Sequence, residues 1–250
     1  MFPIRDHNPS RRTPVVTWAL MAVNILVFIG YWPLFQDERA LYAFYLDWGM
    51  VPARISAGAG YHSFVTSMFL HGGLGHLGGN MLFLWIFGDN LEDEMGRGRF
   101  LGFYLLGGIG AGLGQYLVDP SSGVPVVGAS GAIAAVMGGY LLMFPKARVD
   151  ILIFIVVYVR SLPVPAALML GLWFAFQLLN GAASLGAEGG VAYWAHAGGF
   201  LVGVALTLPL WLARGGTAFW DRTHGHPAHP EAQYPVGRTS IPRVGRRRGN

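Results

Sequence analysis

Six long apolar stretches alternate with polar loops along this chain of 250 residues. An α-helix needs about 20 mostly apolar residues to cross the hydrocarbon core of a bilayer. The pattern therefore predicts an all-α polytopic membrane protein, built as a bundle of six transmembrane helices. The expected spans are residues 14–32, 75–91, 99–118, 129–144, 163–180 and 192–213.

Two further segments favour the membrane surface. The loop 33–74 is rich in aromatic residues, including Tyr42 and Trp48, and amphipathic rings favour the headgroup region. The run from Ile151 to Val159 would reach only about 14 Å as a helix, and basic residues flank it. We expect it to be an interfacial segment. As a seventh span, it would place the C-terminal tail on the other side of the membrane.

Composition supports a membrane protein and limits its chemistry. Hydrophobic residues make up 53% of the chain and charged residues only 12%, whereas soluble domains carry about 25% charged residues. The sequence has no cysteine, which excludes disulfides, thiolate nucleophiles and cysteine metal ligands. Covalent catalysis would therefore use Ser, Thr, Lys or a carboxylate. We expect no cofactor and no metal.

The basic residues indicate the orientation in the membrane. The formal net charge is +4, but the basic residues lie in short loops and in the tail, so we expect no nucleic-acid partner. With six spans and a cytoplasmic N-terminus, fifteen of the 17 basic residues are cytoplasmic, as the positive-inside rule requires. We expect a cytoplasmic segment at 1–13, an anchored bundle at 14–213 without signal cleavage, and a disordered basic tail at 214–250.

Polar residues inside the spans form three groups. They are His71, His76 and Asn80 around the start of the second span, Ser130 at the start of the fourth, and His196 at the start of the sixth. Taken singly, Ser130 could pack helices or cap one, His76 and Asn80 could form an interhelical pair, and His196 could be an interior histidine. The predicted topology places all three groups in the same external leaflet. Shared depth favours a common function.

These residue types in one leaflet suit acyl transfer. A serine hydroxyl needs a neighbouring base, and His196 is the best candidate to accept the proton of Ser130. Asn80, His76 and the backbone N–H of Ser130 could stabilise an oxyanion. Asp119 remains a candidate for the carboxylate of a Ser–His–acid triad, but a Ser–His dyad is the simpler arrangement. Small faces on the fourth and sixth spans, including Gly199 and Gly203, would let these helices approach closely.

At these residues the chain resembles the rhomboid family of intramembrane serine proteases. The resemblance covers roughly residues 14–213 and rests on four motifs. The motifs are His71-x4-His76-x3-Asn80, Gly128-Ala-Ser130-Gly131, Ala195-His196-x-Gly-Gly199-x3-Gly203 and Glu92-x3-Gly96.

The resemblance implies a six-helix bundle around a water-filled cavity that opens to the extracytoplasmic side. It implies Ser130 as nucleophile, His196 as general base, His76 and Asn80 at the oxyanion, and His71 lining the cavity. It also implies single-span transmembrane proteins as substrates within the lipid bilayer. Together with the minimal six-span core, it favours a bacterial inner membrane.

The chain departs from many relatives beside the histidine. Where they carry an aromatic residue four positions after the serine, this chain has Ala134. We therefore expect Tyr193, Trp194 or an aromatic residue of the fifth span to position His196. Phe83 and either Trp173 or Phe174 are candidates for a lateral substrate gate, or else lipid-facing or packed aromatic residues.

Two other functions remain alternatives. One is a catalytically inactive relative that binds membrane proteins, although such relatives usually lack the serine or the histidine. The other is a transporter or channel, which predicts internal repeats and helices broken near the midplane. The polar sites of this chain cluster in one leaflet instead, and the sequence shows no convincing repeat.

Overall fold

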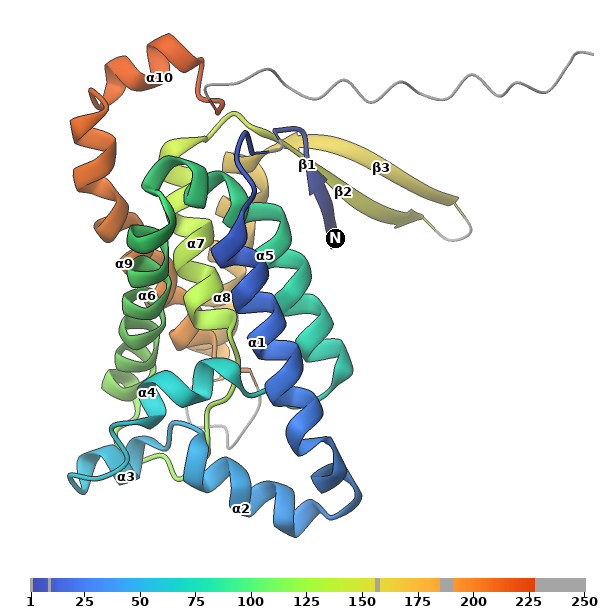
Figure 1. The fold of residues 1–250 in the computed structure, drawn as a ribbon, viewed down its shortest axis with the longest axis vertical. Helices are drawn as coiled ribbons and strands as arrows, with labels where there is room; N and C mark the ends of the chain where they lie inside the picture. The colour runs from blue at the N-terminus through green and yellow to red at the C-terminus, as the bar shows by residue number, and fades with distance from the viewer. Residues whose placement is uncertain (1, 9, 156–157, 185–190, 228–250) are drawn as a thin grey trace, which may run out of the picture.

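Long helices lie at the positions of the six apolar stretches. The computed structural model describes residues 2–8, 10–155, 158–184 and 191–227, and its long helices form one bundle (Figure 1). They are α1 (Val15–Tyr31), α5 (Leu74–Met95), α6 (Arg97–Val118), α7 (Ser130–Met143), α8 (Ala166–Ala183) and α9 (Tyr193–Ala213). Four segments of the described chain are long and apolar enough to cross a membrane: Val15–Gln36, α6, α8 and α9.

Helix α7 is buried among the other helices. It packs against α5, α6, α8 and α9, and Ile133, Met137 and Tyr140 are each 2% exposed or less. Its 14 residues correspond to about 21 Å, shorter than a typical span. Because protein surrounds α7 on most sides, neighbouring helices rather than lipid provide its apolar environment.

Small residues allow α7 and α9 to touch through their backbones. A Cβ atom on Gly199 would collide with the carbonyl of Gly131, and one on Gly203 with the carbonyl of Ala135. Gly138 meets the carbonyl of Phe200 in the same way. The predicted close approach of these two helices is confirmed, and it places their first residues side by side.

Short helices gather at one end of the bundle. They are η1 (Trp32–Gln36), α2 (Glu38–Trp48), α3 (Pro52–Ser56), α4 (Ser63–Thr66) and η2 (Ser67–Phe69). The helices α5, α7 and α9 begin at this same end (Figure 1). The aromatic side chains of Tyr42 and Trp48 on α2 are exposed, as expected for a loop at the headgroup level.

A three-stranded antiparallel sheet lies at the other end of the bundle (Figure 1). Its order is β1 (Phe2–Asp6), β2 (Arg148–Ile155), β3 (Tyr158–Pro165), with Phe2 opposite Leu152 and Arg148 opposite Pro165. The fold is therefore mostly helical and not all-α. The run 151–159 forms strands, with 156–157 outside the described residues, because its β-branched residues favour strands and β1 supplies a pairing edge.

The beginning of the tail is also more ordered than the sequence predicts. Helix α10 (Thr217–Thr223) lies within the segment expected to be disordered. Phe219 is buried, and the Trp220 indole N–H donates a hydrogen bond to the carbonyl of Leu142 at 2.9 Å. These aromatic contacts outweigh the polar composition of this part of the tail. The rest of the predicted disordered tail, from 228 to 250, lies outside the described residues.

The Glu92-x3-Gly96 motif holds three helices together. The buried Glu92 carboxylate on α5 accepts the backbone N–H groups of Val16 and Thr17 at 3.0 and 2.8 Å. It thereby satisfies free donors at the start of α1, where a negative charge is also favourable. Gly96 has a φ of 78°, a left-handed conformation that suits glycine and turns the chain from α5 into α6.

Asp6 of β1 makes the stability of this end of the bundle depend on pH. Its carboxylate accepts hydrogen bonds from the Asn90 amide at 2.8 Å and the Tyr140 hydroxyl at 3.0 Å. Burial, and then the neighbouring Asp89, raises the pKa of Asp6 from 3.8 to about 7. Between these two values the folded protein holds a proton that the unfolded chain has lost. Asp6 therefore costs stability progressively as pH rises from 4 to 7.

We expect Asp6→Asn to stabilise the protein at pH 8 more than at pH 5. The neutral amide keeps an acceptor oxygen, and the removed penalty is at most about 4 kcal/mol. Thermal unfolding in detergent at both pH values measures the difference, with Asp221→Asn on the exposed face of α10 as a control. Equal shifts in melting temperature at the two pH values would contradict the assignment.

Candidate active site

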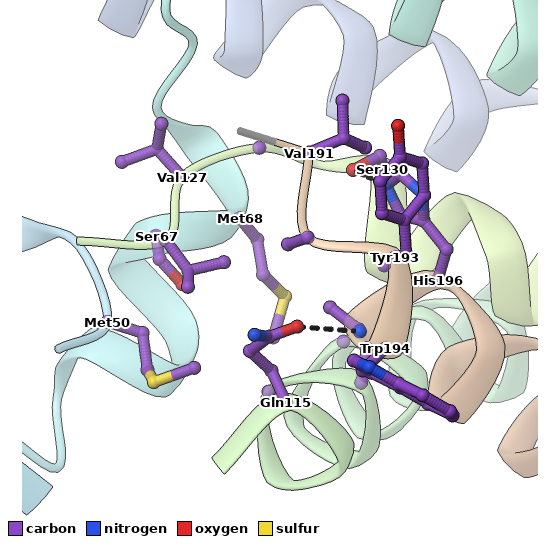
Figure 2. Close-up of a pocket in the computed structure, with 18 of the residues that line it drawn as sticks. Met50, Ser67, Met68, Gln115, Val127, Ser130, Val191, Tyr193, Trp194 and His196 are labelled. Carbon is purple, nitrogen blue, oxygen red and sulfur yellow. Dashed lines mark hydrogen bonds between the residues drawn. The ribbon is translucent and has the colours of Figure 1, made fainter. Parts of the chain in front are cut away.

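A cavity of about 1130 Å³ opens among the helices at the end where α2, α3 and α4 lie. Helices α5 to α9 all contribute to its wall, and four predicted site residues line it: His76, Asn80, Ser130 and His196. Figure 2 shows Ser130 beside His196 at this wall. The polar residues expected in one leaflet therefore lie around one space.

Ser130 and His196 form a hydrogen bond between two helix starts. The Oγ atom of Ser130, the first residue of α7, lies 2.7 Å from Nε2 of His196 in the first turn of α9. The start of α9 is held by Gln115 of α6, whose Oε1 accepts the backbone N–H of Ala195 at 3.2 Å (Figure 2). A hydroxyl bonded to an imidazole nitrogen is the geometry of an activated nucleophile.

Two side-chain donors lie at the wall of the same cavity as Ser130. The Nδ1 atom of His76 accepts the backbone N–H of Gly72 at 3.2 Å, so in the neutral ring Nε2 carries the proton. Nε2 lies close to Gly128, where an added Cβ would be 2.8 Å away. Asn80, one turn further along α5, is buried, and its amide nitrogen has no partner among the described residues.

The backbone adds further donors at the same place. The first N–H groups of an α-helix have no partner within the helix, and α7 has no side-chain cap. Ser130, Gly131 and Ala132 thus begin α7 with their N–H groups at the cavity end. The arrangement offers several hydrogen-bond donors beside one hydroxyl oxygen, which suits a developing oxyanion.

His71 does not line the cavity as expected. Its side chain is 0% exposed and lies against His76, with ring centroids 5.1 Å apart. The hydroxyls of Tyr31 and Tyr45 donate to its carbonyl at 2.8 and 2.9 Å, which holds this turn behind the cavity wall. Burial, and then the nearby His76, lowers the pKa of His71 to about 3, so the ring is neutral and supports His76 from behind.

Gln177 is a polar neighbour of His196 that the sequence did not predict. The Oε1 atom of Gln177 on α8 lies 2.8 Å from Nδ1 of His196. An aromatic residue of the fifth span, Trp173, also faces the imidazole, with ring centroids 5.8 Å apart, whereas the Trp194 ring lies against Gly181. One feature of the sequence could have identified Gln177: it is an amide inside an apolar span. A polar group at that depth is costly unless it has a hydrogen-bond partner.

The carboxylate that the sequence left open is engaged elsewhere. Asp119 accepts hydrogen bonds from the backbone and the hydroxyl of Ser121. No hydrogen bond links a carboxylate to His196 in the part of the chain that the structure describes. Among the described residues, the imidazole of His196 instead lies between the Ser130 hydroxyl and the neutral amide of Gln177.

The candidate gate residues have different positions. Phe83 and Trp173 both line the cavity. Phe174 instead stacks on Phe200, with ring centroids 4.7 Å apart, which is the packed alternative.

Comparisons with known proteins indicate the family of this chain. The family model described as Rhomboid domain matches residues 58–213, more than half of the chain. The chain is 32% identical over 197 residues to Rhomboid protein 1, mitochondrial, of Saccharomyces cerevisiae, covering 76% of this chain and 51% of that protein. It is 29% identical to Rhomboid protease GluP of Bacillus subtilis, covering 78% of this chain and 36% of the relative.

A plant relative extends the comparison. Rhomboid-like protein 11, chloroplastic, of Arabidopsis thaliana is 33% identical over 128 residues, covering 51% of this chain and 41% of that protein. The chain thus spans about half the length of these relatives or less. The matched region contains the serine, both histidines of the cavity wall and the amides around them. This chain, a membrane protein with apolar helices, belongs to the rhomboid family.

Proposed function

We propose that the protein is an intramembrane serine endopeptidase that cleaves transmembrane segments through a Ser130–His196 dyad and an acyl-enzyme. The observation that carries this proposal is the 2.7 Å hydrogen bond between Ser130 Oγ and His196 Nε2 at the wall of the cavity. The unpartnered amide nitrogen of Asn80, at the wall of the same cavity, supports the same reaction. A packing serine would need neither a base nor an unpaired buried donor.

The reaction follows from the position of each group. Ser130 Oγ attacks the scissile carbonyl carbon while His196 Nε2 takes its proton. The oxyanion accepts hydrogen bonds from Asn80, His76 and the N–H groups at the start of α7. The tetrahedral intermediate collapses as His196 returns the proton to the leaving amine. A water molecule, deprotonated by His196, then hydrolyses the ester and restores the Ser130 hydroxyl.

The proposal includes six spans, with both termini in the cytoplasm and the cavity facing the extracytoplasmic side. The alternating directions of the long helices support it, as does the short α7 within the bundle (Figure 1). We further propose a bacterial inner membrane, in keeping with the bacterial relative GluP. A reporter fused to the C-terminus tests the topology: activity only inside the cell supports six spans, and activity only outside overturns them.

Proteolysis and passive binding make different predictions. We expect the purified protein in liposomes to cut a single-span reporter within or next to its transmembrane segment, and to release both fragments. An inactive relative would retain the intact reporter on affinity purification instead. Recovery of intact reporter alone, with a correctly folded protein, would favour the binding function over the protease.

Gly128→Ala should strongly reduce cleavage. Gly128 has a φ of 134°, and an added Cβ would lie 2.8 Å from His76 Nε2 and 3.4 Å from Ser130 Oγ. The methyl group therefore strains the backbone and displaces His76 from the oxyanion position. Reporter cleavage by Gly123→Ala is the control, because Gly123 belongs to the same loop and a Cβ there has open space. Equal rates for the two variants would contradict this role.

A further inference from the structure

The imidazole of His196 is held from two sides. On one side Nε2 faces the Ser130 hydroxyl of α7, and on the other Nδ1 faces the Gln177 amide of α8 at 2.8 Å. His76 of α5 is near enough to interact electrostatically with this ring, Tyr193 of α9 lies beside it (Figure 2), and Trp173 of α8 covers it. Only one ring nitrogen of a neutral imidazole carries a proton. The partner of Nδ1 therefore determines whether Nε2 donates or accepts a hydrogen bond.

The orientation of the Gln177 amide follows from its second contact. Its Nε2 atom donates a hydrogen bond to the backbone carbonyl of Trp173 at 3.3 Å. The reverse orientation would place two oxygen acceptors against each other. The amide oxygen therefore faces His196, and an oxygen there requires a proton on Nδ1. With the proton on Nδ1, Nε2 presents a lone pair to the Ser130 hydroxyl.

Burial makes this contact effective. Gln177 is 8% exposed, and α8 packs along α9, so the amide is shielded from competing water. A neutral amide also avoids the cost of a carboxylate at this depth in a membrane. It orients the ring as the carboxylate of a catalytic triad does, but it brings no charge of its own.

We propose that Gln177 is a positioning residue for the reaction, which fixes the His196 tautomer and the ring orientation so that Nε2 accepts the Ser130 proton. This inference rests on the proposed protease function. Gln177 acts through His196 and does not touch the reacting atoms. It adds a polar contact to the aromatic contact that Trp173 makes with the same ring.

Two near-isosteric variants test the proposal. Gln177→Met keeps the length and loses the acceptor, so kcat should fall about 10- to 100-fold, part of the 10²–10⁴ that a positioned base contributes, with KM little changed. Gln177→Glu keeps an acceptor for the Nδ1 proton, so it should retain more activity than Gln177→Met. Its carboxylate favours the imidazolium, so the acid limb of the pH–rate profile should move to higher pH.

Asn180 offers a matched control on the same helix. Its amide donates to the Phe176 carbonyl at 2.7 Å, a bond equivalent to that of Gln177, but its side chain is exposed. Asn180→Leu should cleave the reporter like the wild type, with a melting temperature that reports the cost of losing such a bond. If Gln177 had only a structural role, Gln177→Met and Asn180→Leu would have similar kcat and KM values. The pH–rate profile of Gln177→Glu would then match that of the wild type.

The outcomes separate the two claims. If the wild type cleaves and Gln177→Met keeps its kcat, the positioning role is overturned and the protease function stands. If Gln177→Met fails to fold, the pH profile of Gln177→Glu decides: a shift supports the role and an unchanged profile overturns it. If the folded wild type does not cleave, the proposed function itself fails.

Discussion

Ser130→Ala and His196→Ala are each expected to reduce kcat for reporter cleavage by about 10⁴- to 10⁶-fold. Ser130→Ala removes the attacking oxygen, and His196→Ala removes the base that receives its proton. Because the two groups act as one unit, the double variant should be no slower than either single variant. Cleavage rates in liposomes, measured at saturating reporter, give this comparison.

Thermal unfolding of the two variants shows whether a loss of activity is due to a loss of folding. Ser130→Ala loses one side-chain hydrogen bond and His196→Ala loses two. At about 1 kcal/mol for each bond, both variants should still fold, and the melting temperature of Ser130→Ala should lie closer to the wild type. Ser161→Ala, in the exposed part of β3, should cleave normally. Full activity of either Ser130→Ala or His196→Ala would exclude the dyad, and additive losses in the double variant would show that the residues act independently.

Asn80→Ala is expected to lower kcat by about 10²- to 10³-fold, the usual effect of removing one oxyanion donor. The amide nitrogen of Asn80 is buried without a partner among the described residues, so its removal should not destabilise the protein. A structural role predicts the opposite combination, a lower melting temperature with little change in kcat. Kinetics and thermal unfolding on the same preparation distinguish the two.

Asn80→Asp sharpens the test of Asn80. The carboxylate has nearly the same shape and no donor when ionised, so it should be at least as inactive as Asn80→Ala. Wild-type kcat in Asn80→Asp would contradict an oxyanion role, because shape alone would then be sufficient.

The bundle and the Ser–His pair could be predicted from the sequence for local reasons. Apolar stretches specify helices by themselves, and the glycines Gly199 and Gly203 indicate which face allows close approach. The common depth of His76, Ser130 and His196 follows from counting spans. These inferences need only the order of the spans and the residues near their ends, and the structure places the three side chains around one cavity.

The features that were missed depend on contacts between distant segments. Strand β1 pairs with β2, about 145 residues away, and no local pattern near Phe2 predicts that partner. The amide of Gln177 stands alone in an apolar helix, and only the packing of α8 against α9 shows that it faces His196. Helix α10 was not predicted because its two aromatic residues, Phe219 and Trp220, belong to a tail rich in Arg, Pro and His, a composition typical of disorder.

The proposed Ser130–His196 dyad is tested most directly by covalent labelling of the active protein with a serine-directed inhibitor, followed by peptide mass spectrometry. We expect one adduct, on Ser130, with labelling abolished in Ser130→Ala and strongly slowed in His196→Ala, because Ser130 Oγ and His196 Nε2 lie 2.7 Å apart. Labelling of a preparation that cleaves the reporter, but at a residue other than Ser130, would contradict it.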